Sequence, residues 1–221
     1  MAYISCGEGK NALVFLHGMG GAADIWWQQI LALKASYIIL APTYPAIAGI
    51  DNLAYGVSAI MEHEGIDQAS IVGTSLGGYL AQYFVRLYPA KVTKCIFSNT
   101  FAPNDIIAKK TKLAVLLAPL IPEIPLMRIY RKSIIESVYP ASGYNELVKA
   151  CLLEKGYGLM TKDQLIARYR CVIDKFTPPD LTAKQTYPLV RIATFHNTGH
   201  FTYLNRPEEY TVIIRNFLRQ N

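Results

Sequence analysis

Short apolar runs alternate with amphipathic stretches through the first hundred residues of the chain. This alternation predicts a parallel sheet flanked by helices. The predicted strands share a short, β-rich apolar core and cover residues 12–16, 37–40, 69–72 and 94–98. The predicted helices have apolar side chains at helical spacing and cover residues 25–33, with Asp24 as the N-cap, and then residues 51–64 and 76–88.

The pattern changes after residue 102. No strand is evident between residues 103 and 176, and four prolines fall between positions 119 and 140. Helical spacing is clear in residues 144–153 and 162–175. A further strand is expected at residues 190–195, followed by a C-terminal amphipathic helix at residues 208–219. We therefore expect a sheet core formed by residues 1–102 and 177–221, with residues 103–176 inserted as a helical cap.

Composition supports a folded domain. The chain has 221 residues, of which 52% are hydrophobic and 17% charged, a balance that argues against disorder and against a coiled coil. The net charge is +6, but the basic clusters around residues 109–112 and 128–132 are short and accompany no nucleic-acid motif. We interpret them as solvated helix faces, with an anion site as the alternative, and expect no nucleic-acid partner.

The four cysteines are Cys6, Cys95, Cys151 and Cys171, and none lies in a Cys-x-x-Cys pair or a zinc-ligand spacing. Scattered reduced thiols are typical of a cytoplasmic protein, although Cys151 and Cys171 could pair if the fold brought them together. Residues 1–10 lack the pattern of a secretory signal, and prolines interrupt the apolar run at residues 113–126. We expect cytoplasmic localisation, no integral membrane span, no metal and no cofactor.

One motif carries candidate chemistry. Gly73-Thr74-Ser75-Leu76-Gly77 matches G-x-S-x-G, with a predicted strand before it and a predicted helix after it. A sharp strand-to-helix turn would hold Ser75 in strained backbone geometry and expose its hydroxyl. We predict that Ser75 is a catalytic nucleophile.

A serine hydroxyl needs a base at neutral pH, and His200 is the best candidate. It follows the last predicted strand, so its loop can fold over the sheet edge where Ser75 is expected. Where a G-x-S-x-G motif joins a strand to a helix and its serine is a nucleophile, the serine also precedes the histidine along the chain. Of the other histidines, His17 is expected to shape a loop, His63 to face solvent and His196 to be structural.

Acyl transfer also needs donors for the developing oxyanion. His17-Gly18-Met19-Gly20-Gly21 follows the first predicted strand. The backbone N–H groups of Met19 and Leu76 are the predicted oxyanion hole.

Together these motifs resemble the α/β-hydrolase superfamily, with Gly199-His200-Phe201 and Asn205-Arg206-Pro207-Glu208 completing the match. Residues 23–33 and 75–82 are most similar to the maspardin-like group. The resemblance implies an α/β-hydrolase fold, with a mostly parallel sheet, flanking helices and an inserted cap. Maspardin itself is regarded as an interaction protein without a complete triad, whereas this chain has both Ser75 and His200.

The chain departs from the superfamily pattern at the triad acid. The superfamily places the acid a few tens of residues before the histidine, but Asp180 and His200 are only 20 apart (200 − 180). A parallel crossover alone needs about a dozen residues or more, and the gap does not hold one. Either the protein has a real deletion of this strand, acid and helix, or the sequence omits a stretch between positions 185 and 186, and we favour the second. The acid is therefore unassigned, with Asp105 and Asp180 as weak candidates that are alternatively a helix cap and a loop cap.

The sequence therefore predicts a carboxylesterase-like serine hydrolase acting on a small or medium acyl ester, with a small-molecule substrate. The alternative is a catalytically impaired, maspardin-like scaffold that binds a protein partner. A peroxidase- or lyase-type reaction on the same residues is a third possibility.

Overall fold

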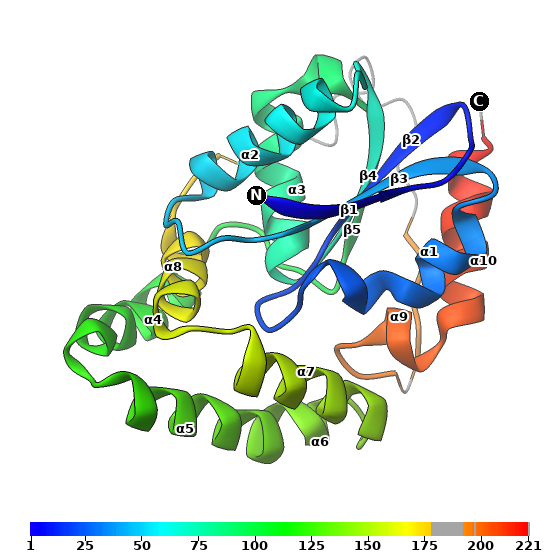
Figure 1. Ribbon diagram of the computed structural model, residues 1–221. Helices are drawn as coiled ribbons and strands as arrows, with labels where there is room; N and C mark the ends of the chain where they lie inside the picture. Colours follow the sequence, from blue (N-terminus) through cyan, green and yellow to red (C-terminus); the bar gives the residue numbers. More distant parts are fainter. Residues whose placement is uncertain (178–191, 197, 221) are drawn as a thin grey trace.

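The computed structural model describes residues 1–177, 192–196 and 198–220. Five strands form one sheet in the order β1-β3-β2-β4-β5 (Figure 1). They are β1 Ala2–Cys6, β2 Asn11–Leu16, β3 Tyr37–Thr43, β4 Ala69–Thr74 and β5 Val92–Ser98. β1 runs antiparallel to β3, and the other pairs are parallel. The four strands predicted in this part of the chain are thus confirmed.

β1 was not predicted, and its environment explains why. It lies at the sheet edge and alternates between exposed and half-buried residues, so it carries no continuous apolar run. β2 and β4 lie inside the sheet, where both faces are covered, and their sequences are correspondingly apolar.

Helices cover both faces of the sheet. α2 Ile50–His63 and α3 Leu76–Leu87 lie on one face, and η1 Ala23–Trp26, α1 Trp27–Leu33 and α10 Pro207–Leu218 on the other (Figure 1). Each face of the sheet has its own hydrophobic core, and successive residues of β2 point into the two cores alternately. Leu13 and Phe15 pack toward α1 and α10, whereas Val14 and Leu16 pack toward α2 and α3. The mostly parallel sheet with flanking helices is confirmed.

Asp24 does not cap a helix, contrary to expectation. It lies inside the 3₁₀ turn η1, which has no side-chain cap. Its carboxylate instead accepts a 2.5 Å hydrogen bond from Lys155 Nζ, and Lys155 is buried. A buried ammonium group needs a counter-charge, and this requirement takes the Asp24 side chain away from the helix start.

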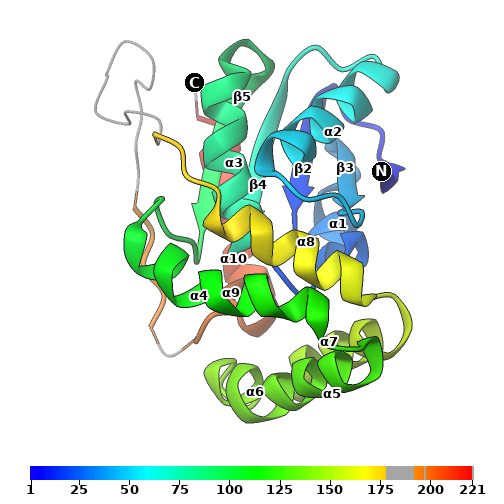
Figure 2. The same ribbon diagram turned by 90° about the vertical axis from the view of Figure 1, so that its left-hand side faces the viewer.

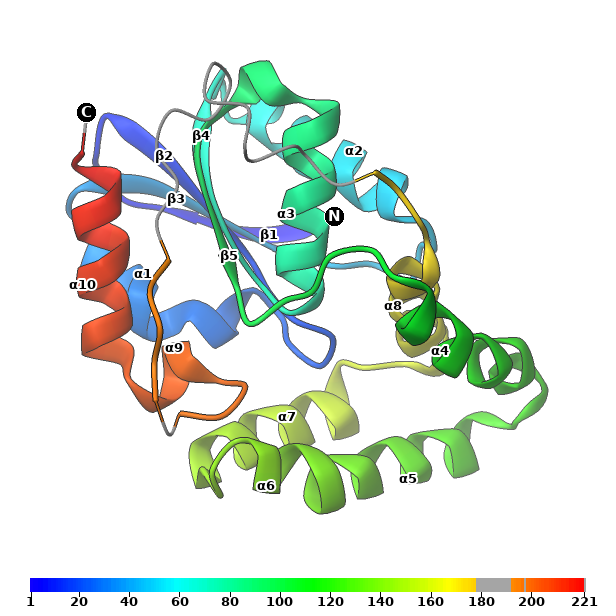
Figure 3. The same ribbon diagram turned by 180° about the vertical axis from the view of Figure 1, so that it is seen from behind.

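Residues 103–176, called the helical insertion below, contain helices and no strand. Their division from the core as a cap stays a prediction. The elements of the insertion are α4 Asp105–Leu117, η3 Ala118–Leu120, α5 Glu123–Ser133, the π-helical turn η4 Ile134–Val138, α6 Tyr139–Ala141, α7 Glu146–Gly158 and α8 Lys162–Ile173. α4 and α8 lie side by side (Figure 2). α5 to α7 lie at the end of the sheet from which the loop after β2 projects (Figure 3).

The prediction of a strand at residues 190–195 is wrong for those of its residues that the structure describes. Positions 190 and 191 lie outside the described residues, and residues 192–195 are not in a strand. Ile192 is 91% exposed, whereas Phe195 packs against Tyr210 of α10. Alternating side chains are not sufficient for a strand, because the backbone must also pair with a neighbour.

Two short elements complete the core, η2 Pro89–Lys91 before β5 and α9 Thr202–Asn205 before α10. No helix in the described ranges combines the length and apolar character that a bilayer crossing requires.

The glycines of the G-x-S-x-G motif are packed against backbone. A Cβ on Gly77 would lie 2.1 Å from the carbonyl oxygen of Leu16, which cannot move without breaking β2. We expect Gly77→Ala to lower the free energy of unfolding by about 1–3 kcal/mol or more in urea denaturation. Gly158→Ala is the matched control, because a Cβ on Gly158 would meet nothing within 4 Å. Its stability should be unchanged or slightly higher, and equal effects of the two substitutions would contradict this account.

Candidate active site

Ser75 stands at the turn between β4 and α3. Its φ of 53° and ψ of −118° are unusual for a residue with a side chain, and such strain costs about 1–3 kcal/mol. The end of β5 holds the turn: Ser75 N donates to Ser98 O at 3.0 Å, and Thr100 Oγ1 donates to Ser75 O at 2.7 Å. The strained turn expected from the motif is present.

The loop after β2 approaches Ser75 closely. A Cβ on Gly18 would lie 3.2 Å from Ser75 Cβ, so only a glycine fits without displacing the serine. This loop, residues 17–21, is called the oxyanion loop below because it contains Met19, one of the two predicted oxyanion donors.

His17 is fully buried and fixes the start of the oxyanion loop. Tyr44 N–H donates to His17 Nε2 at 3.3 Å, which assigns the proton to Nδ1, and Nδ1 lies 2.7 Å from Gly18 O. The ring also stacks on Tyr44, with centroids 3.8 Å apart. Burial, and then the nearby Arg168 charge, hold the pKa of His17 well below its usual range, so the ring is neutral. Loop shaping is therefore its observed role.

The two predicted oxyanion donors have no acceptor among the described residues. Leu76 is the first residue of α3, where an N–H has no partner within the helix. Met19 N–H belongs to the same peptide group as Gly18 O, which His17 and Gly21 N–H both contact. Hydrogen bonds to that oxygen polarise the group and strengthen Met19 N–H as a donor.

His200 lies on a loop that is bonded to the helical insertion. His200 N donates to Ala141 O at 3.2 Å, and a Cβ on Gly199 would lie only 2.2 Å from the same oxygen. Gly199 has a φ of 60°, so the turn requires a glycine for space and for conformation. Asn205 Nδ2 adds a bond of 2.8 Å to Ser142 O. The role of Asn205 was not predicted, although the residue is part of a motif that carries the family resemblance.

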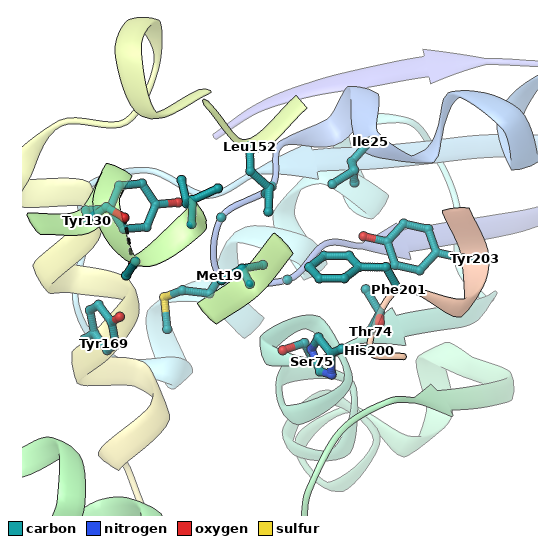
Figure 4. A pocket seen from close by; sticks show the side chains of 16 residues that line it. Met19, Ile25, Thr74, Ser75, Tyr130, Leu152, Tyr169, His200, Phe201 and Tyr203 are labelled. Atoms are coloured by element: carbon teal, nitrogen blue, oxygen red, sulfur yellow. Dashed lines mark hydrogen bonds between the residues drawn. The ribbon is translucent and has the colours of Figure 1, made fainter. Parts of the chain in front are cut away.

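The structure brings Ser75 and His200 to one cavity of about 180 Å³ (Figure 4). No hydrogen bond joins Ser75 Oγ to the His200 ring within the described ranges, and the His200 residue as a whole is exposed. The protein around the imidazole nevertheless removes enough water to lower the pKa of His200 below its usual value. The remaining walls come largely from the insertion and include Tyr130, Ile134, Val138, Leu152 and Tyr169.

Of the two acid candidates only Asp105 is among the described residues, and it does not lie in the cavity with His200. Asp105 is ion-paired with Lys175 at the surface, both side chains are more than half exposed, and Asp105 does not line the cavity. The N-cap of α4 is Asn104, whose side chain accepts from Ile107 N at 3.0 Å. Asp180, and the break in the superfamily pattern between positions 185 and 186, lie outside the described residues.

No group of three or more His, Cys, Asp or Glu side chains is arranged to hold a metal ion in the described ranges.

Residues 11–116 match the family model described as alpha/beta hydrolase fold. Maspardin from Rattus norvegicus is 34% identical over 97 residues, which cover 42% of this chain and 37% of maspardin. The aligned stretch thus spans little more than a third of the length of this relative.

A second relative aligns along nearly the whole chain. The 2-hydroxy-6-oxononadienedioate/2-hydroxy-6-oxononatrienedioate hydrolase of Burkholderia vietnamiensis is 25% identical over 263 positions, which cover 99% of this chain and 90% of that protein. Because 263 positions face only 221 residues, at least 42 of them have no residue here.

The enol-lactonase from Burkholderia xenovorans LB400 has a similar structure. The TM-score is 0.78 at 15% sequence identity, with 99% of this chain and 96% of that chain covered. Likeness at this identity concerns the fold, and it agrees with the family model that the fold is that of the α/β hydrolases.

The backbone strain at Ser75 can be measured. Ser75→Gly should raise the free energy of unfolding by about 1 kcal/mol, because glycine adopts this conformation without penalty. Ser75→Ala keeps a Cβ and should leave stability close to that of the wild type. Chemical denaturation of the three proteins tests this, and a Ser75→Gly variant no more stable than Ser75→Ala would show that the turn is not strained.

Proposed function

We propose that this chain, a member of the α/β-hydrolase superfamily, is a serine hydrolase that cleaves small or medium acyl esters. The observation that carries the proposal is that Ser75, His200 and Met19 line one cavity. The backbone N–H groups of Met19 and of Leu76, the residue after Ser75, have no acceptor among the described residues. Names of two similar proteins support hydrolytic chemistry, since one is a hydrolase and the other a lactonase.

The proposed reaction has two halves. Ser75 Oγ attacks the ester carbonyl while the His200 ring takes its proton, and the N–H groups of Met19 and Leu76 stabilise the negative oxygen. Collapse of this intermediate breaks the bond to the alcohol, which leaves with the proton from His200. A water molecule then attacks the acyl-serine in the same way, releasing the carboxylic acid and restoring Ser75.

The helical insertion is proposed to act as a cap that binds the acyl group. Aliphatic and aromatic side chains of α5, η4 and α7 line the cavity, which supports an apolar acyl chain over a charged one. The cavity volume of about 180 Å³ favours a short chain.

A non-catalytic scaffold is the second candidate, and one observation favours it. None of the described residues lining the cavity is Asp or Glu, and among the described residues no carboxylate contributes to the lowered pKa of His200, whose cause is burial. Loss of the acid in a serine triad lowers kcat by roughly 10⁴. The partial likeness to maspardin is consistent with this alternative, in which the surface binds a protein partner.

Covalent labelling separates the two candidates. A fluorophosphonate probe should label the wild type, and Ser75→Ala should abolish labelling, because the probe reacts with an activated serine. Mass spectrometry of the labelled peptide checks the site. Absence of labelling in the wild type, or equal labelling of Ser75→Ala, would overturn the enzymatic proposal.

Turnover of p-nitrophenyl acetate tests the base. His200→Ala should lower kcat/KM by about 10²–10⁴-fold, the usual contribution of a general base. His63→Ala is the control, since His63 is exposed on α2 and should leave activity unchanged. Turnover that His200→Ala abolishes would also argue decisively against the scaffold alternative.

The pH profile follows from the His200 environment. The ring must be neutral to accept a proton, and burial lowers its pKa, so it stays neutral through pH 7. We expect kcat/KM to be constant at neutral pH and to fall on acidification with an apparent pKa below 6.5. A carboxylate partner would raise the pKa, so an acidic limb centred above 6.5 would contradict this description of the site.

A further inference from the structure

We infer that Arg168, on α8 of the helical insertion, is a positioning residue that holds the oxyanion loop in its working conformation. The expected effect of Arg168 on kcat rests on the proposed function, whereas its effect on the structure of the oxyanion loop does not. Arg168 is 3% exposed and does not line the cavity. It therefore acts through the loop rather than on the substrate.

Arg168 binds the oxyanion loop directly. Nη1 donates to Met19 O at 2.7 Å and to Gly21 O at 2.9 Å. Nη2 donates to Tyr44 O at 3.3 Å. One guanidinium thus holds two carbonyls of the loop and one of the segment that follows β3.

The contacted carbonyls determine where Met19 N–H points. Met19 O and Met19 N–H lie on adjacent peptide planes, so fixing the oxygen restricts the backbone torsions between them. Three of the five loop residues are glycines, which lose the most conformational freedom when they are ordered. A loop of this composition needs external contacts to stay ordered, and Arg168 supplies two of them.

A second route runs through Tyr44. Arg168 holds Tyr44 O, while Tyr44 N–H and Tyr44 OH bond to His17 Nε2 and His17 O, at 3.3 and 3.0 Å. His17 in turn contacts Gly18 O, the oxygen of the peptide group that carries Met19 N–H. Both ends of the oxyanion loop are therefore connected to one side chain.

The buried charge of Arg168 is held by backbone carbonyls. Taking a guanidinium out of water is costly, and a carboxylate partner is the common compensation. Among the described residues no Asp or Glu forms an ion pair with Arg168, and backbone carbonyls are its acceptors. The charge is thus directed at the loop instead of being neutralised by an acid.

The test compares Arg168→Met, which keeps much of the side-chain volume but no donor, with Arg168→Lys and with Arg170→Met. Arg170 lies on the same helix and is exposed, so it controls for changes to α8. Circular dichroism first establishes that each variant is folded at the assay temperature. Two readouts follow: hydrogen exchange of a peptide covering residues 17–21, and kcat and KM for p-nitrophenyl acetate.

We expect Arg168→Met to speed exchange in the oxyanion loop at least about tenfold. Its kcat should fall about 10- to 100-fold, as for a displaced oxyanion donor, while KM stays within about threefold. Arg168→Lys should recover part of kcat, because an ammonium can still reach one or two carbonyls. Arg170→Met should match the wild type in both readouts.

Wild-type exchange at residues 17–21 in Arg168→Met would overturn the inference, as would a kcat no lower than that of Arg170→Met. If Arg168→Met does not fold, Arg168→Lys decides by the same two readouts, and no change in either would overturn it. If the wild type shows no Ser75-dependent turnover, the proposed function fails, and the exchange result still decides whether Arg168 orders the loop.

Discussion

Contact between backbones, closer than any side chain would permit, is the constraint on which this site depends. At Gly73 a Cβ would lie 2.2 Å from Gly77 O, and at Gly77 it would lie 2.1 Å from Leu16 O. These contacts pack β4, the start of α3 and the end of β2 against one another. Ser75 stands where they meet, so its strained backbone follows from the packing around it.

In the proposed function, the same close packing directs two backbone N–H groups at the reacting oxygen, while no Lys or Arg is among the described residues that line the cavity. The first residue of α3 offers an N–H because helix geometry leaves it unpaired. The oxyanion loop offers another because His17, Tyr44 and Arg168 restrict its backbone from behind. Fixed dipoles of this kind need no reorganisation when charge develops, which is the property that acyl transfer requires.

Local signals in the sequence predicted much of the fold. Continuous apolar runs marked the buried strands, and the glycines around Ser75 marked the turn, since both patterns reflect contacts near in sequence. β1 was missed because an exposed edge strand needs no apolar run. The strand expected at residues 190–195 failed because strand formation depends on a neighbour that the sequence does not reveal.

In the candidate site, too, local motifs were predicted from the sequence, whereas contacts between distant residues were not. Ser75, His200 and Met19 line one cavity, although their catalytic roles remain predictions, as does the division into a core and a cap. Arg168 gave no signal, because one arginine in an amphipathic helix is ordinary and its three acceptors lie 124 to 149 positions away. The ion pair of Asp24 with Lys155 was equally hidden, since it joins positions 131 apart.

The anchoring of the His200 loop has a mechanical consequence. Ser75 lies at the end of the sheet strand β4, whereas the backbone N–H of His200 donates to Ala141 O, at the end of the short helix α6 of the insertion. In the proposed function, the nucleophile and the base are therefore held by different parts of the chain, and a shift of α6 would change the position of His200 relative to Ser75. Loss of the bond between His200 N and Ala141 O would leave Ser75 in its strained turn but without a fixed position for its proposed base.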